Sequence, residues 1–129
     1  MAVVINGRDL TVEEVIRVCR GDEKVEIAPE AQKAIQKARD YIEKKLEEGA
    51  VIYGLTTGFG KFANVLISKE ETADLQRNLI ISHTCALGEP YPRQYVRAAM
   101  LLRCNALSRG NSGIRLSTVQ TMVDMLNAG

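Results

Sequence analysis

The sequence predicts a mainly α-helical fold with a small β element near the N-terminus. Three observations support this prediction. Apolar residues recur at three- and four-residue spacing over most of the 129 residues, as on the buried face of a helix. Two capping boxes, Thr11–Glu14 and Ser68–Glu71, mark helix starts. Short runs of β-branched residues occur at Val3–Ile5 and Val25–Ile27, and both lie within the first 27 residues.

The N-terminal segment predicts a strand at Val3–Ile5 followed by a tight turn at Asn6–Gly7. Asn-Gly accepts the positive φ angles of a type I′ hairpin turn, so Val25–Ile27 is expected to be the returning strand. A helix between them begins after Thr11, and Gly21 is expected to stop it in the left-handed conformation.

Four further helices follow along the chain. One begins at Pro29, whose missing N–H is harmless in a first helical turn, and ends at Gly49. The next runs from Ser68 to about residue 83 or 85, and another runs from 92 to 109 between breaking residues. The last is expected to be capped by Ser117 together with a glutamine three residues later.

The composition excludes several classes of protein. A net charge of +1 gives no electrostatic reason to expect nucleic acid or a membrane surface as a partner. No secretory signal and no apolar run of membrane-spanning length is present, so a cytoplasmic location is expected. Cys19, Cys85 and Cys104 are widely spaced and odd in number, which favours buried thiols over disulfides or zinc. With one histidine and no acidic cluster in a turn, no metal site is expected.

A glycine-rich loop is the main candidate site. Tyr53 directly follows the apolar run 50–52 and opens the octapeptide Tyr-Gly-Leu-Thr-Thr-Gly-Phe-Gly. Glycine adopts positive φ at little steric cost, so such a loop lets a phenol approach a small substrate closely and act as an acid or base. The residues expected to support Tyr53 are Gly54, Thr57, Gly58, Phe59 and Gly60.

Other polar residues allow two interpretations. The stretch 58–63 matches the G-x-G-x-x-[G/A] fingerprint of a dinucleotide site, but such a site is not expected, because the next helix starts too late and no further strand follows. His83 is either a helix-end histidine bonded to nearby carbonyls or a contact for a substrate side chain. Asn105 and Ser108 lie on a buried helix and are expected to satisfy backbone groups rather than to perform chemistry.

Four blocks of sequence carry a family resemblance: 53–60, 75–83, 88–90 and 107–116. In order and without large gaps, they resemble the aromatic amino acid lyases, and the histidine ammonia-lyases in particular. The resemblance implies an enzyme that eliminates ammonia from L-histidine to give urocanate. It implies that Tyr53 serves in acid–base steps and that His83, preceded by Ser82, contacts the substrate side chain. An ordinary phenol has a pKa near ~10, so this role requires a site that favours phenolate.

The resemblance also implies a prosthetic group and an assembly. The family's electrophile, 4-methylidene-imidazol-5-one (MIO), forms autocatalytically from Ala-Ser-Gly, and its active sites are built by several subunits of a homotetramer. Residues 1–129 contain no Ala-Ser-Gly, and the family's chains are several times longer. The expectation is therefore the N-terminal part of an ammonia-lyase, truncated before the prosthetic-group motif and inactive by itself.

Two alternatives remain open at this point. The parent could be a tyrosine or phenylalanine ammonia-lyase, or an aminomutase of the same family. From a different class, the chain could be a non-catalytic helical interaction module that keeps the lyase N-terminal fold.

Overall fold

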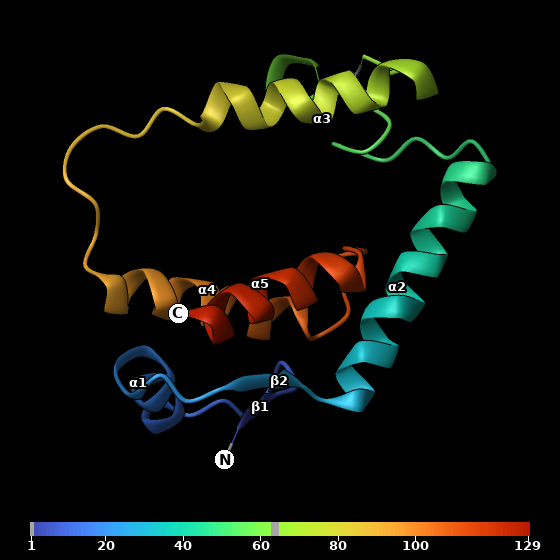
Figure 1. The fold of residues 1–129 in the computed structure, drawn as a ribbon. Helices are drawn as coiled ribbons and strands as arrows, with labels where there is room; N and C mark the ends of the chain where they lie inside the picture. The colour runs from blue at the N-terminus through green and yellow to red at the C-terminus, as the bar shows by residue number, and fades with distance from the viewer. Residues whose placement is uncertain (1, 63–64) are drawn as a thin grey trace. The chain divides into compact units, whose positions relative to one another are not determined.

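A computed structural model describes residues 2–62 and 65–129 (Figure 1). Within these ranges the chain forms five α-helices, two strands and one short 3₁₀-helix at Gly60–Phe62, so the mainly helical prediction is confirmed. The chain divides into two compact units. The first comprises Met1–Ile42 together with Pro90–Gly129, and the second comprises Glu43–Glu89.

The two strands pair in parallel, not as the expected hairpin. β1 (Val3–Ile5) lies beside β2 (Val25–Ile27), with Val3 opposite Val25 and Ile5 opposite Ile27. α1 (Val12–Gly21) connects them, because parallel strands cannot be joined by a two-residue turn. Both strands bury their outer residues and expose the central one, so one face of the sheet enters the core.

The hairpin prediction fails at Asn6. Gly7 has φ +85°, but Asn6 does not adopt the positive φ of a type I′ turn. Its side-chain oxygen instead accepts hydrogen bonds from the N–H groups of Arg8 and Asp9, at 2.9 and 3.1 Å. These bonds direct the segment after Asn6 into α1 rather than back alongside β1 as a second strand.

α1 begins as expected and ends one residue later than expected. Thr11 Oγ1 accepts from the N–H of Glu14, and the Glu14 carboxylate accepts from the N–H of Thr11, which confirms the capping box. Gly21 still belongs to the helix, whereas Asp22 takes the left-handed conformation at φ +54°. The prediction that Gly21 is the left-handed stop is therefore wrong.

α2 (Pro29–Glu47) has both predicted ends. Gly49 has φ +73°, its N–H donates to the carbonyl of Leu46, and the next N–H, of Ala50, donates to the carbonyl of Lys45. This pair of bonds is a Schellman motif, in which a left-handed glycine lets the last carbonyls of a helix find donors.

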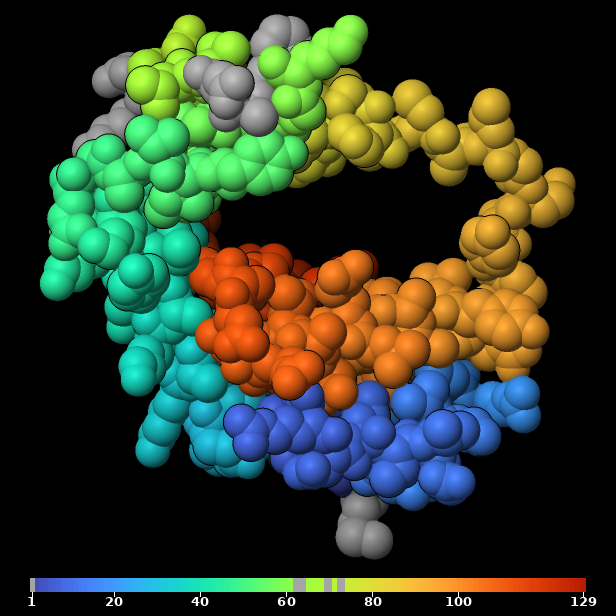
Figure 2. All heavy atoms as spheres, turned by 180° about the vertical axis from the view of Figure 1, so that it is seen from behind, coloured from blue at the N-terminus to red at the C-terminus, as the bar shows by residue number. Residues whose placement is uncertain are grey.

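α4 (Arg93–Leu107) and α5 (Leu116–Ala128) cover the sheet and α1 within the first unit (Figure 1). Figure 2 shows the N-terminal residues packed against α4. Ser117 does not cap α5: the helix begins at Leu116, and Arg115 precedes it without a side-chain bond. The largest fully buried apolar side chains of this core are Val3, Ile5, Val18, Val25, Ile35, Leu101, Cys104, Val119 and Val123.

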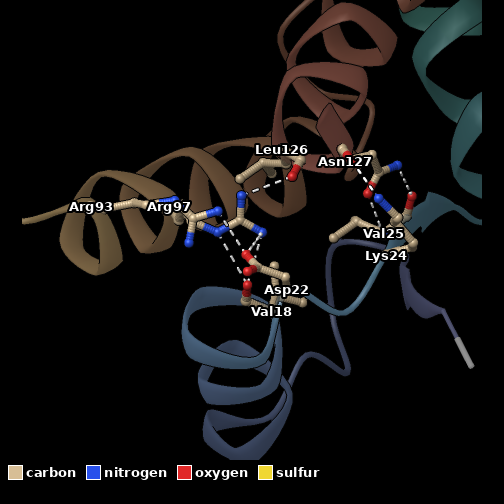
Figure 3. A network of polar contacts seen from close by, with 8 residues as sticks. All are labelled: Val18, Asp22, Lys24, Val25, Arg93, Arg97, Leu126 and Asn127. Carbon is tan, nitrogen blue, oxygen red and sulfur yellow. Dashed lines mark hydrogen bonds and ion pairs between the residues drawn. The ribbon is translucent and has the colours of Figure 1, made fainter. Parts of the chain in front are cut away.

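A buried arginine joins the ends of two helices (Figure 3). Arg97 on α4 is only 4% exposed, and each of its three side-chain nitrogens donates a hydrogen bond. Its Nε and Nη2 donate to the carbonyl of Val18 in the last turn of α1, and its Nη1 donates to the carbonyl of Leu126 in the last turn of α5. Asp22 lies 3.3 Å from Nη2 and also accepts from Arg93 at 2.8 Å. A cation at two helix C-termini is favourable, because both ends carry unpaired carbonyls and partial negative charge.

Asn127 attaches the end of α5 to β2. Its side-chain amide accepts from the N–H of Val25 at 2.8 Å and donates to the carbonyl of the same residue at 2.9 Å (Figure 3). The amide thus makes the two bonds that a neighbouring strand would make, and it covers part of the open edge of β2.

Candidate functional site

Hydrogen bonds within the Tyr53 loop close it on itself. Thr56 Oγ1 accepts from the N–H of Ile52 at 2.8 Å, and the N–H of Thr56 donates back to the carbonyl of Ile52 at 2.9 Å. Thr57 is buried, accepts from the N–H of Gly54 and forms an antiparallel bridge with Leu66. The loop is therefore a folded element, although it contains three glycines.

The Tyr53 side chain is contacted from two sides, although the residue is 64% exposed. The Phe59 ring meets it edge to face, with centroids 5.9 Å apart and an interplanar angle of 73°. The N–H of Gly60 donates to Tyr53 Oη at 3.4 Å. Gly54 has φ +70°, and a Cβ there would lie 2.8 Å from Phe59 Cε1, so only glycine admits the Phe59 ring at this distance.

His83 is the last residue of α3 (Lys69–His83). The predicted capping box starts this helix: Ser68 Oγ accepts from the N–H of Glu71, and the Glu71 carboxylate accepts from Ser68. The exposed imidazole of His83 places Nδ1 2.8 Å from the carbonyl oxygen of Leu79 and 3.1 Å from Ser82 Oγ. The interpretation as a helix-end histidine bonded to a carbonyl is therefore confirmed, and among the described residues no hydrogen bond is found to Nε2.

The loop and α3 share a pocket within the second unit. A mostly apolar cavity of about 340 Å³ is lined by Gly58, Phe59 and residues 65 and 67 on the loop side, and by residues 75, 78, 79 and 82 on the helix side. Its polar lining groups on α3 are the side chains of Asn78 and Ser82. Cavities of this size and character accept small organic molecules.

The structure unites some of the predicted site residues and not others. Tyr53, Phe59 and Gly60 are in direct contact, and Ser82 contacts His83. Within residues 2–62 and 65–129, Tyr53 and His83 share no hydrogen bond or ring contact. Asn78, a pocket residue, was missed by the sequence analysis, although it lies five residues before His83 in a recognised block.

Comparison with known proteins identifies the family of this chain. The family model for aromatic amino acid lyase matches residues 10–129. The chain belongs to the aromatic amino acid lyase family. The histidine ammonia-lyase of Caldanaerobacter subterraneus subsp. tengcongensis is 51% identical over 125 residues, covering 97% of this chain and 25% of that relative.

Two solved structures show the same fold. Histidine ammonia-lyase from Trypanosoma cruzi matches with a TM-score of 0.89 at 36% identity, over 100% of this chain and 25% of that one. The ergothioneine-degrading enzyme ergothionase from Treponema denticola matches with a TM-score of 0.93 at 31% identity, over 98% of this chain and 26% of that one. The chain thus spans about a quarter of the length of the lyases that it matches.

Polar residues elsewhere in the chain have structural roles. Asn105 Oδ1 accepts from the N–H of Gly7 and Ser108 Oγ donates to the carbonyl of Cys104, as expected for residues that satisfy backbone groups. Cys19 and Cys104 are buried as expected, but Cys85 is exposed, so that part of the cysteine prediction is wrong.

Neither a membrane span nor a metal cluster is found in the described ranges. Among the helices that the structure describes, none is both long and apolar enough to cross a membrane. In the same part of the chain, no three His, Cys, Asp or Glu side chains gather as metal ligands would.

Proposed function

We propose that this chain is the N-terminal part of a histidine ammonia-lyase, which eliminates ammonia from L-histidine to give urocanate. The single observation that carries the proposal is the 51% identity to a histidine ammonia-lyase across 97% of the chain. The presence of a histidine at position 83 after Ser82 supports the choice of L-histidine over phenylalanine, which offers no polar group for an imidazole to contact.

Tyr53 is the proposed acid–base residue. The elimination takes a proton from the β-carbon and releases the amino group from the α-carbon, so a group that accepts or donates a proton at the substrate is required. The N–H of Gly60 donates to Tyr53 Oη, and this bond uses a lone pair of the oxygen rather than the hydroxyl hydrogen. The Phe59 ring limits how far the phenol swings.

His83 is the proposed contact for the substrate side chain. Its imidazole is exposed, and one ring nitrogen is already bonded to the end of α3, so the ring is held in orientation. Such a contact binds and orients the amino acid and takes no part in the proton transfer.

The electrophilic MIO group that the family resemblance implies would withdraw electrons from the substrate. The 129 residues include no Ala-Ser-Gly from which the group forms, so this chain's residues do not fit as its source. The chain alone is therefore proposed to be inactive.

We extend the proposal to a cytoplasmic homotetramer. Four apolar side chains of the second unit, Val51, Leu66, Ile80 and Ile81, are each more than half exposed. Exposed apolar side chains of this kind favour burial against other protein, either from the same polypeptide or from a neighbouring subunit. Light scattering of the complete polypeptide measures the assembly directly.

The proposal is tested by reading the coding sequence past the codon for Gly129. If it continues and encodes Ala-Ser-Gly, the complete reading frame is expressed and ammonia release from L-histidine, L-tyrosine and L-phenylalanine is compared. Preferential turnover of L-histidine, lost in Tyr53→Phe, is the expected result. Turnover of tyrosine or phenylalanine instead, or interconversion of α- and β-amino acids, would replace the proposal with one of the related activities. A stop codon after Gly129 would favour the non-catalytic interaction module.

A further inference from the structure

Thr57 holds the backbone next to the proposed acid–base residue. Its Oγ1 accepts from the N–H of Gly54 at 3.2 Å, and that N–H belongs to the peptide group that joins Tyr53 to Gly54. On the other side of Tyr53, the carbonyl of Ile52 accepts from the N–H of Thr56 at 2.9 Å. Both peptide groups that flank the Tyr53 Cα are therefore restrained, and they set the direction in which the phenol leaves the backbone.

The restraint on the Gly54 side depends on a side chain, because Thr56 acts on its side through a backbone N–H. The hydroxyl of Thr57 donates its hydrogen to the carbonyl of Gly58 at 3.0 Å, so a lone pair is left to face the N–H of Gly54. Thr57 is 3% exposed, so water has little room to replace the hydroxyl as an acceptor. Loss of this oxygen would therefore release the Gly54 peptide.

Thr57 is itself anchored without the help of the tyrosine. The N–H of Gly58 donates to the carbonyl of Val65 at 3.1 Å, and the N–H of Ile67 donates to the carbonyl of Thr56 at 3.0 Å. These bonds use only backbone groups, so they do not depend on which side chain follows Thr56. They provide a fixed base from which the Thr57 hydroxyl reaches the tyrosine turn.

Gly54 connects this hydrogen bond to the phenol. It has φ +70°, and a Cβ there would lie 2.8 Å from Phe59 Cε1, so the Phe59 ring packs directly on the glycine. The same ring meets the Tyr53 ring edge to face. A rotation of the Gly54 peptide would therefore shift the tyrosine against the ring that contacts it.

We propose that Thr57 is a positioning residue for proton transfer, because its hydroxyl holds the Gly54 peptide and thereby places Tyr53 Oη at the substrate. This inference rests on the proposed acid–base role of Tyr53. A proton acceptor works only within hydrogen-bond reach of the proton that it takes. The phenol is exposed, so restraint through the backbone is needed to keep it within that reach. A misplacement of about 1 Å can lower a rate on the order of 100-fold.

Kinetics of the polypeptide encoded by the complete reading frame test the catalytic consequence. Thr57→Val keeps the shape of the side chain and removes the hydroxyl, whereas Thr57→Ser keeps the hydroxyl. Thr57→Val should lower kcat for L-histidine on the order of 100-fold and leave KM nearly unchanged, because the loss falls on the chemical step. Thr57→Ser should keep most of kcat. An unchanged kcat in Thr57→Val, an equal loss in Thr57→Ser, or a change confined to KM would overturn the inference.

Nuclear magnetic resonance of the 129-residue chain tests the positioning directly. The ring centroids of Tyr53 and Phe59 are 5.9 Å apart, which is close enough for a nuclear Overhauser effect between their protons. This effect should be present in the unaltered chain and in Thr57→Ser, and absent in Thr57→Val. Its persistence in Thr57→Val would overturn the inference.

Hydrogen exchange at the amide of Gly58 shows whether the loop stays folded in these variants, because that amide is bonded to the carbonyl of Val65. Its protection should be the same in Thr57→Val as in the unaltered chain. Loss of protection in Thr57→Val would overturn the inference, since Thr57 would then stabilise the whole loop rather than place the tyrosine.

The outcomes separate this inference from the proposed function. Turnover of L-histidine that Thr57→Val leaves unchanged would overturn the inference and leave the function intact. Absence of turnover for every aromatic amino acid, despite an encoded Ala-Ser-Gly, would overturn the function and with it the catalytic consequence of Thr57. The resonance experiment would still decide whether Thr57 places the tyrosine.

Discussion

Replacement of Arg97 by methionine should remove much of the stability of the first unit. Methionine keeps most of the apolar volume of the side chain but donates no hydrogen bond. The carbonyls of Val18 and Leu126 would then lose a charged donor in a position that is 4% exposed. Breaking a buried charged network typically costs about 3–5 kcal/mol, against a total stability of roughly 5–15 kcal/mol for an ordinary domain.

Arg93→Met is the matched control. Arg93 lies on the same helix and contacts the same carboxylate of Asp22, but its side chain is 54% exposed. Exposed ion pairs contribute roughly 0–1 kcal/mol, so this variant should unfold almost as the unaltered chain does. Urea unfolding followed by circular dichroism, with hydrogen exchange at the amides of α1 and α5, measures both. Equal losses of unfolding free energy in the two variants would refute the argument that burial makes the Arg97 bonds more important than those of Arg93.

Three further predictions concern single residues. Gly54→Ala should displace the Tyr53 loop and change the amide chemical shifts of the loop, because the new Cβ would lie 2.8 Å from a ring carbon of Phe59. Gly49→Ala is the control, since Gly49 also has a positive φ but faces open space. It should cost about 1–2 kcal/mol of stability and leave the amide shifts of the loop unchanged. The hydrogen bond from Arg93 lowers the pKa of the Asp22 carboxyl in the folded chain. The ionised carboxylate should therefore stabilise the fold above the unfolded-state pKa of ~3.9, and this stabilisation should disappear as the pH falls through the lower pKa of the folded state. Urea midpoints of Asp22→Asn and the unaltered chain should therefore differ near neutral pH and converge in acid. Burial raises the pKa of the Cys104 thiol to about 11, so a thiol reagent should modify exposed Cys85 in the folded chain long before Cys104.

Features set by neighbouring residues were predictable from the sequence. The capping boxes at Thr11 and Ser68 depend on a carboxylate three positions later, and both form. Pro29 and Gly49 bound α2 for reasons confined to one helical turn. The sequence also identified the glycine-rich tyrosine loop from its own eight residues, but not the hydrogen bonds that close the loop on itself.

Features set by distant residues were not predictable. Asn6–Gly7 indicates a hairpin locally, but the N–H of Gly7 is bonded to Asn105, and a Cβ on Gly7 would lie 2.6 Å from Arg109 Cγ. The parallel pairing follows from α1, which the sequence did predict between the two strands, so the hairpin prediction overlooked a helix that was already in view. The bond of Asn127 to β2 could not be foreseen, because the two residues that it joins are 102 positions apart. α5 likewise starts at Leu116, one residue before Ser117, and Leu116 packs against the core.

In the candidate site, too, contacts within one helix were predictable and contacts between separate segments were not. The bond from His83 to the Leu79 carbonyl spans four residues of one helix, and the sequence analysis anticipated a carbonyl contact. The pocket lined by Phe59, Asn78 and Ser82 depends on how the loop meets α3, and no sequence spacing defines that.

The pairing of Val25 with Asn127 has a consequence for how the protein is made. These residues are 102 positions apart, yet the amide of Asn127 covers the edge of β2. A ribosome adds about 5–20 residues per second, so β2 would wait roughly 5–20 s for this partner. During that interval a short apolar strand with an open edge is exposed in the cell. Nascent-chain assays should find the first 30 residues bound by chaperones until α5 has emerged.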